Sequence, residues 1–303
     1  MKSRTLLNLG LAGIAILLSL LVFYEPGLDQ APVKKLTNFN KTQFSHIKID
    51  QRDGNTIELA KEGAHWQITA PINVQANEQR IDSLLNIATT TSYAQFSTSG
   101  RDLSAYKLDA PRVQLHLDDI TIAFGNTDPV NHRRYVRIAD TVHLITDIFY
   151  YHLITDMSGY ISPLLLPTAD PITSIKLPGI SLARSESGQW HSHTRNPEAS
   201  VGKLENFISR WQHAQALNVK RHVAASTNAK TRGKIRIKLA SGKVIDLAIM
   251  EKEATLYLVR KDISMAYQMP PNSKQTLLTI SDDQQKDTSG NIQSGAGENP
   301  GQK

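Results

Sequence analysis

Two histidines placed two positions apart could hold a metal ion. His191 and His193 flank Ser192 in "QWHSH", and on a strand this spacing puts both imidazoles on one face. Imidazole is a common ligand of zinc and copper. A metal site needs further ligands, and no other residue stands at a recognisable ligand spacing from the pair. The alternative is two solvated histidines on an edge strand, so we expect no metal and no cofactor.

A basic strand offers a second kind of chemistry. In "NHRRYVR" the alternation sets Arg133 and Arg137 on one face with Tyr135 between them, and Arg134 on the other. Guanidinium groups can bind a phosphate or a carboxylate through two hydrogen bonds each. Arg133 and Arg137 are therefore candidates for an anion contact. The alternative is the solvated outer face of an antiparallel sheet, where charged side chains are ordinary.

The sequence carries none of the familiar enzyme motifs. The Gly-Lys pair of "ASGKV" lies between two predicted strands, whereas a phosphate-binding loop needs G-x-x-x-x-G-K-[ST] before a helix. Neither G-x-S-x-G nor H-E-x-x-H occurs. The chain also has no cysteine, which excludes disulfides, thiolate metal sites and a cysteine nucleophile. We therefore predict no catalytic residue and expect a protein that is not an enzyme.

Two tryptophans occupy similar stretches, "GAHWQITAP" and "SGQWHSHTRNP". Trp66 and Trp190 each follow a glycine, sit on an alternating segment and precede a proline and a helix-like segment. Exposed aromatic side chains at such places could recognise a partner. Because a tryptophan buries a large apolar area, packing beneath the following helix is the favoured interpretation. Both residues are predicted to be structural.

The first half reads as strands, one helix and then more strands. "HIKID" and "TIELAKE" alternate around the turn "RDGN", and "HWQITAP" makes a third strand. Apolar residues of the next segment recur with helical spacing from Ile81 to Ala88, with Asn77 as the N-cap. "RDLSAYKLDAPR" is a polar connection, two further strand pairs span "VQLHLDDITIAFG" and "RRYVRIADTVHLIT", and a short helix is expected at Asp147–Leu153.

The second half repeats this order at offsets of about 122 to 128 residues. The landmark pairs are Ile47 and Ile175, Trp66 and Trp190, Leu84 and Phe207, Leu115 and Ile237, Ile122 and Leu247, and Arg137 and Arg260. The predicted fold class is α+β, with two repeated units of antiparallel sheet plus one covering helix. A proline-rich stretch separates the first unit, 42–166, from the second, 167–280. The polar tail 281–303 has little to bury and is predicted to be disordered.

The N-terminus predicts a membrane anchor. Residues 6–24 form an apolar run long enough to cross a bilayer as a helix. Lys2 and Arg4 precede the run, so residues 1–5 are predicted to lie in the cytoplasm and the rest of the chain outside. The alternative is a cleaved signal peptide, but the run ends in "VFYEP", without the small residues of a cleavage site. Residues 25–41 then form a tether.

The overall charge argues against nucleic acid as a partner. The 303 residues include 34 lysines and arginines and 28 aspartates and glutamates. These charges are scattered along the chain, whereas a nucleic-acid surface concentrates them on one face. With 40% hydrophobic residues the chain is globular in composition.

These motifs together resemble a bacterial family, domain of unknown function 4340 (DUF4340). The motifs that carry the resemblance are "I-x-I", "DG", "I-x-L" and "W-x-I-x-x-P" between Ile47 and Pro71, "YKLDAPRVQL" at Tyr106–Leu115, "I-x-F-G" at Ile122–Gly125 and "RYVR" at Arg134–Arg137. The resemblance covers 42–278 and is stronger in the first half, since "KTRGKIRI" and "DLAIM" replace the matching motifs in the second. It implies a membrane-anchored envelope protein of repeated α+β units, encoded in some bacteria beside ABC-type export or gliding-motility components.

We therefore expect a single-pass protein of the bacterial inner membrane whose bulk is periplasmic. The expected function is a scaffold or accessory subunit that binds an envelope protein, for example in an ABC-transporter complex. The alternative is a periplasmic module that binds or handles an envelope lipid or glycan. A partner site would be an exposed apolar patch, whereas a ligand site would be a concave pocket with converging polar groups.

Overall fold

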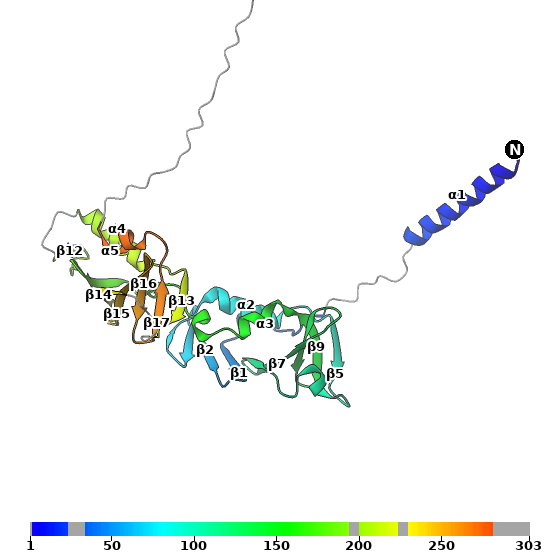
Figure 1. Cartoon of the computed structure of the whole chain (residues 1–303), viewed down its shortest axis with the longest axis horizontal. Helices are drawn as coiled ribbons and strands as arrows, with labels where there is room; N and C mark the ends of the chain where they lie inside the picture. The colour runs from blue at the N-terminus through cyan, green and yellow to red at the C-terminus, as the bar shows by residue number, and fades with distance from the viewer. Residues whose placement is uncertain (1, 24–33, 194–199, 224–229, 281–303) are drawn as a thin grey trace, which may run out of the picture. The chain divides into compact units, whose positions relative to one another are not determined.

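The computed structural model describes residues 2–23, 34–193, 200–223 and 230–280 (Figure 1). The chain forms two compact units, Met1–Ser162 and Pro163–Lys303, which divide inside the proline-rich stretch "SPLLLPTADP". Each unit contains one antiparallel sheet and a few helices. The expected α+β class is therefore confirmed.

The N-terminal segment is the helix α1 (Lys2–Phe23). Large apolar side chains along it, from Leu7 to Leu20, are exposed. Within the described part of the chain, no helix is both long enough and apolar enough to cross a membrane. Tyr24, most of the predicted tether and the predicted disordered tail 281–303 lie outside the described residues.

The first unit has a nine-stranded sheet in the order β4-β3-β2-β1-β6-β7-β8-β9-β5. Its strands are β1 (His46–Gln51), β2 (Thr56–Glu62), β3 (His65–Ala70), β4 (Val74–Gln75), β5 (Ala94–Ser97), β6 (Val113–Leu117), β7 (Ile120–Thr127), β8 (Arg133–Ile138) and β9 (Thr141–Thr146). Side chains alternate across each strand, so Ile47 and Ile49 of β1 are buried while Lys48 between them is exposed.

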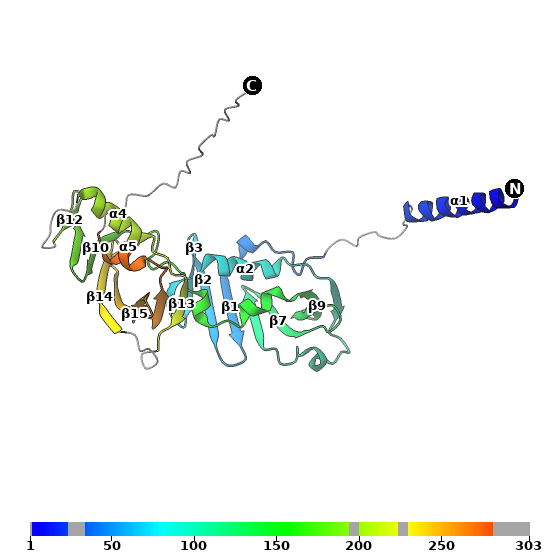
Figure 2. The same ribbon diagram turned by 45° about the horizontal axis from the view of Figure 1, so that its top comes forward.

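Helix α2 (Glu78–Ala88) packs its apolar side against the buried face of this sheet (Figure 2). Ile81, Leu84 and Leu85 are buried there, as their helical spacing predicts. Asn77 caps the helix, because its Oδ1 accepts a hydrogen bond from the backbone N–H of Arg80 at 3.3 Å. The predicted helix and its predicted cap are both present.

Several short helices precede, join or follow the strands of the first unit. They are η1 (Lys41–Gln43), η2 (Leu103–Tyr106), η3 (Asp147–Phe149), α3 (Tyr150–Leu153) and η4 (Met157–Tyr160), the η elements being 3₁₀ helices. The connection 98–112 includes residues 101–112, which the sequence predicts to form a polar connection. It contains η2 and packs on the outer face of the sheet. Leu108 of this segment is buried against Ala123 and Val142.

The second unit has an eight-stranded sheet in the order β12-β11-β10-β14-β15-β16-β17-β13. Its strands are β10 (Ile172–Leu177), β11 (Ile180–Arg184), β12 (Trp190–Ser192), β13 (Asn218–Arg221), β14 (Lys230–Leu239), β15 (Val244–Lys252), β16 (Thr255–Arg260) and β17 (Met265–Gln268). Helices α4 (Val201–Gln212) and α5 (Ser273–Leu278) lie together on one side of it (Figures 1 and 2). The indole N–H of Trp211 joins them by donating to the carbonyl of Leu277 at 2.9 Å.

Apart from β4, the two sheets have the same strand order, so β1 corresponds to β10, β6 to β14, β7 to β15 and β8 to β16. Two landmarks of the sequence comparison are wrong. Ile47 pairs with Leu117 and Ile175 pairs with Ile237, so the counterpart of Ile237 is Leu117 and not Leu115.

The match of Arg137 with Arg260 is wrong by one residue. Ala123 pairs with Arg137, whereas Ala248, the counterpart of Ala123, pairs with Val259. Arg260 therefore points to the other face, where it is buried and forms an ion pair with Asp262 at 2.6 Å.

Candidate functional site

The histidine pair does not form a metal site with other described residues. His191 lies on β12 and His193 follows the strand; both are exposed. The backbone N–H of His193 donates to the carbonyl of Ser181 at 2.8 Å, which fixes the main chain but not the imidazole. Among the described residues, no three His, Asp or Glu side chains come close enough together to hold a metal ion.

The arginines of β8 contact protein groups. Arg133 places its guanidinium carbon 3.7 Å from the ring centre of Tyr93, a cation–π contact. Arg137 is half-buried between its neighbours Ala123 and Val142. Arg134 lies on the opposite face, as the alternation predicts, and its Nη2 donates to Asp147 Oδ2 at 3.0 Å. The strand thus contributes Arg134 to a structural ion pair. The alternation of the strand could not identify its partner Asp147, which lies outside the strand.

The two tryptophans lie inside their own units. Trp66 is 5% exposed and Trp190 is 8% exposed. The backbone of Trp66 also joins β3 to the start of α2, because its N–H donates to Glu78 Oε1 at 2.9 Å and its carbonyl accepts from Ala76 N–H at 2.8 Å. Neither side chain is available as an exposed recognition aromatic.

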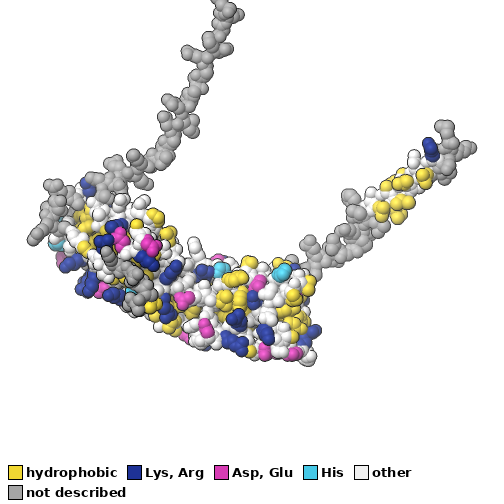
Figure 3. Space-filling model, viewed as in Figure 1, with side chains coloured by type: hydrophobic (Ala, Val, Ile, Leu, Met, Phe, Trp, Pro, Cys, Tyr) yellow, Lys and Arg dark blue, Asp and Glu magenta, His cyan; other side chains and the backbone are white. Residues whose placement is uncertain are grey.

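Three exposed apolar residues of η3, α3 and the next position form what we call the apolar stripe. Ile148, Tyr151 and Ile154 are 65%, 74% and 47% exposed. Their spacing of three residues places them on one side of this short helical segment. Hydrophobic side chains lie next to Lys and Arg side chains on this face in Figure 3, near the place that Figure 1 labels α3.

The segment that carries the apolar stripe is held firmly by the core of the first unit. At its start, Asp147 accepts hydrogen bonds from Arg134 and from the hydroxyl of Thr127. At its end, the side-chain amide of Gln51 donates to the carbonyls of Leu153 at 2.8 Å and Thr155 at 3.1 Å. The stripe is therefore a fixed surface.

A shallow basic hollow adjoins the stripe. It has a volume of about 460 Å³ and is lined by Gln51, Arg52, Asp53, Arg112, Tyr150 and Ile154. Arg52 and Arg112 come together because the backbone N–H of Arg52 donates to the carbonyl of Arg112 at 2.9 Å. The stripe thus combines an apolar centre with cations at its rim.

Two buried polar side chains of the first unit, Ser92 and His143, contact each other. The Ser92 hydroxyl lies 2.9 Å from His143 Nδ1, and both residues are buried. Burial lowers the pKa of His143. Within the described residues no Asp or Glu forms an ion pair with His143, so this serine and histidine lack the third member of a catalytic triad.

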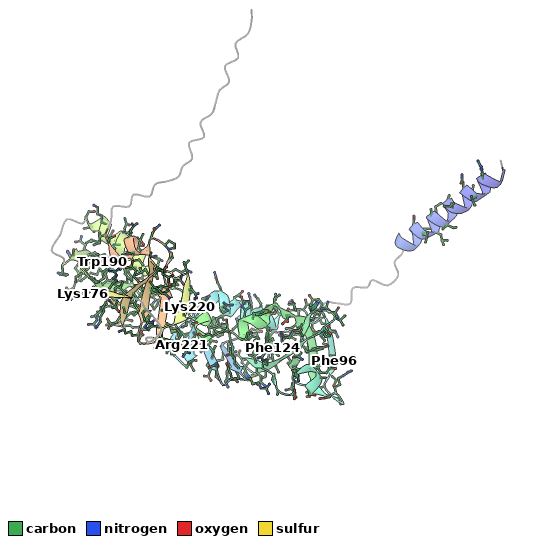
Figure 4. All side chains as sticks on the ribbon, in the orientation of Figure 1. Phe96, Phe124, Lys176, Trp190, Lys220 and Arg221 are labelled. Carbon is green, nitrogen blue, oxygen red and sulfur yellow. The ribbon has the colours of Figure 1, made fainter. Side chains whose placement is uncertain are left out.

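The second unit has a larger depression, which we call the basic hollow of β14. It has a volume of about 830 Å³. Its charged lining residues are Lys176, Lys234, Arg236, Lys261, Asp246 and Asp262, and its apolar lining includes Leu177, Pro178, Val244 and Ala248. Figure 4 labels Lys176 in the second unit, and Figure 3 shows Lys and Arg side chains near the place that Figure 1 labels β14.

Strand register assembles this hollow. Lys176 of β10 lies directly opposite Arg236 of β14, which in turn lies opposite Asp246 of β15. Arg236 binds Asp246 through two hydrogen bonds, Nε to Oδ1 at 2.8 Å and Nη2 to Oδ2 at 3.0 Å. Hydrogen bonding to Arg236 lowers the pKa of Asp246, so this carboxyl is ionised at neutral pH.

Sequence reasoning missed both the apolar stripe and the basic hollow of β14. The alternation in "KIRIK" contains the signal for the hollow, because it sets Lys234, Arg236 and Lys238 on one face of β14. The contribution of Lys176 depends on which strand pairs with β14. That pairing joins residues about sixty positions apart in the chain.

Comparisons with known proteins identify a family. No curated protein and no solved structure matches the chain. The family described as "Domain of unknown function (DUF4340)" matches residues 66–233, more than half of the chain. The match begins at Trp66 in the first unit and ends at Gly233 on β14 in the second, so it includes the apolar stripe. The chain therefore belongs to the DUF4340 family, as its motifs indicated.

Proposed function

We propose that this protein is a membrane-anchored scaffold or accessory subunit of an envelope complex, such as one built around an ABC transporter, and not an enzyme. The observation that carries the proposal is the apolar stripe Ile148, Tyr151 and Ile154. Isolated apolar residues on a surface are ordinary, but a contiguous group with a polar rim is typical of a contact between proteins.

Two properties make the stripe suitable for binding a protein. Tyrosine and arginine are enriched at the energetic centres of interfaces, and the stripe has Tyr151 at its middle with Arg52 and Arg112 near Ile154. The bonds of Asp147 and Gln51 also fix the segment before any partner arrives. A fixed surface loses less conformational entropy on binding.

The anchor is the second part of the proposal. Residues 6–24 would span the inner membrane once, with residues 1–5 in the cytoplasm and the two α+β units, which we interpret as repeats, in the periplasm. Support comes from the apolar run, from Lys2 and Arg4 before it and from the exposed apolar side chains of α1. The proposed span reaches Tyr24, beyond the described residues. Alkaline phosphatase fused after residue 40 should be active, and an inactive fusion would contradict this orientation.

Affinity purification of the full-length protein from detergent-solubilised membranes tests the scaffold role. We expect a stoichiometric protein partner with the wild type and its loss from the variant Ile148→Ser/Tyr151→Ser/Ile154→Ser. A matched control is Val130→Ser/Leu217→Ser, which changes exposed apolar residues outside the stripe. Recovery of the wild type without a partner, or equal recovery from both variants, would contradict the proposal.

The basic hollow of β14 favours a second candidate function, the binding or handling of an envelope lipid or glycan. A concave surface with converging charged groups and an apolar lining is the usual form of a ligand site. Under this proposal a lipid or glycan accompanies the purified protein and can be extracted from it. Purified protein that carries neither would contradict this second function.

A further inference from the structure

We propose that the basic hollow of β14 binds the phosphate-bearing headgroup of an anionic lipid. The proposal rests on the second candidate function and narrows it to one ligand chemistry. Four cations, Lys176, Lys234, Arg236 and Lys261, line the hollow against two carboxylates, Asp246 and Asp262. The excess of positive charge therefore favours an anion as the occupant.

Strand pairing makes this cluster costly in the absence of an anion. Lys176 and Arg236 are direct cross-strand neighbours, and like charges at such positions repel each other. Asp246 binds Arg236 through two hydrogen bonds and also interacts electrostatically with Lys234. Neither Lys176 nor Lys234 forms an ion pair with a carboxylate among the described residues. Two ammonium groups without a close ion-pair partner thus lie beside a guanidinium.

The first unit provides an internal comparison. Its strand pair β1 and β6 occupies the same place in the strand order as β10 and β14. There, Asp50 lies opposite Gln114 and binds both Lys48 at 3.0 Å and His116 at 3.1 Å. The same architecture therefore accommodates balanced charge, and the cationic surface belongs specifically to the second unit.

The outer faces of the two sheets differ as well. In the first unit the connection 98–112 crosses the outer face, and Gly125 permits this because a Cβ there would lie 2.2 Å from the carbonyl oxygen of Tyr106. Met250 on β15 occupies the position that corresponds to Gly125. Leu247 corresponds to Ile122, and Met250 follows Leu247 by three residues, as Gly125 follows Ile122. The corresponding connection in the second unit, between β13 and β14, has eight residues, 222–229, of which the structure describes 222 and 223. Among the described residues, the hollow lies over β10, β14 and β15 of the second sheet.

Size and lining favour a lipid headgroup as the occupant. A volume of about 830 Å³ far exceeds what a free phosphate ion would fill. Val244 is half exposed, and Leu177 and Pro178 lie beside the lysines, so the cations border an apolar strip. Lysine ammonium groups and an arginine bind phosphate oxygens. An amphiphile with a phosphate headgroup matches both kinds of surface.

Lipid titration of the full-length protein in a non-ionic detergent tests the inference. The probe is dioctanoyl phosphatidylglycerol, and native mass spectrometry counts the bound lipid. We expect Lys176→Gln/Lys234→Gln to weaken binding about 25-fold, since each cation near an anionic lipid contributes about fivefold. The matched control, Lys61→Gln/Lys252→Gln, removes two exposed lysines outside the hollow and should bind as the wild type does. Unchanged thermal melting shows that each variant folds.

Several results would overturn the inference. Equal affinity in the two double variants would show that the hollow is not the site, and equal binding of dioctanoyl phosphatidylcholine would show that headgroup charge is not recognised. Displacement of the lipid by the same concentration of inorganic phosphate or of a polyglutamate peptide would assign the hollow to a free ion or to a protein. Displacement by an acidic oligosaccharide would also overturn it, while leaving the second candidate function standing. The purification test of the apolar stripe is independent of this lipid test, because no residue of the stripe lines the basic hollow of β14.

Discussion

Gly125 shows how one missing side chain positions a whole segment. The carbonyl oxygen of Tyr106 and the side chain of Leu108 occupy the space that a Cβ would need. We expect Gly125→Ala to lower the free energy of unfolding by about 1–3 kcal/mol, the usual cost of overpacking a core. Urea denaturation measures the change.

The matched control is Gly202→Ala in helix α4, where nothing lies within 4 Å of the added Cβ. Because alanine favours a helix, this substitution should be neutral or stabilising by up to about 1 kcal/mol. Equal effects of the two substitutions would show that the contact with Tyr106 does not constrain position 125.

His143 predicts a pH dependence of stability in the first unit. Burial lowers its pKa in the folded protein, so the unfolded chain takes up the proton first as the pH falls. The stabilisation is complete above the ordinary histidine pKa of about 6.5 and is lost as the pH falls towards the lower folded pKa. We expect His143→Gln to reduce the loss of stability between about pH 7.5 and pH 5.5, measured by urea denaturation.

His191→Gln is the control for this experiment because His191 is exposed on β12. It should leave the pH dependence of the wild type unchanged. Burial and the neighbouring Arg80 also lower the pKa of His152, so the His143 variant should keep part of the slope. An unaltered slope in His143→Gln would contradict the assignment.

At the scale of elements, the two covering helices differ in their caps. The side chain of Asn77 caps α2, whereas Ser200 at the start of α4 makes no capping hydrogen bond. Asn77→Ala should therefore cost about 1 kcal/mol, and Ser200→Ala should cost clearly less. Thermal or urea unfolding of the two variants compares them, and equal losses would contradict the role of the Asn77 side chain.

The elements that the sequence predicts well are those with a repeated pattern. Alternation identifies β1 and β2, and helical spacing identifies α2 together with its cap. The shorter elements β4, β5, β13 and α5 escape prediction. Strands of two to four residues and a six-residue helix hold too few periods for a pattern to appear, and tertiary contacts with neighbouring elements define them instead.

Pairing between distant strands also limits what the sequence reveals of the candidate sites. The alternation in "KIRIK" predicts the basic face of β14. Lys176 lies beside this face only because β10 pairs with β14 in the register that places Lys176 opposite Arg236. The apolar stripe is hidden for a different reason. An exposed apolar residue and a buried one look alike in sequence, and only packing on α2 shows which side of residues 147–154 faces solvent.

At the scale of the whole molecule, the chain has two units whose antiparallel sheets share one strand order apart from β4. The units differ where their outer faces differ. The first has the connection 98–112 packed on its outer face and an apolar stripe, and the described strands of the second carry a cationic hollow. We infer that the two units perform different tasks, protein contact in the first and ligand contact in the second.

Site-specific photo-crosslinking in intact membranes tests the scaffold role most directly. A photoreactive phenylalanine analogue replaces Tyr151 at the centre of the stripe, or Tyr93, another exposed tyrosine of the first unit, as the control. We predict one discrete crosslinked protein from position 151 and none from position 93. No crosslink from position 151, or the same products from both positions, would contradict the proposal that the apolar stripe is the partner surface.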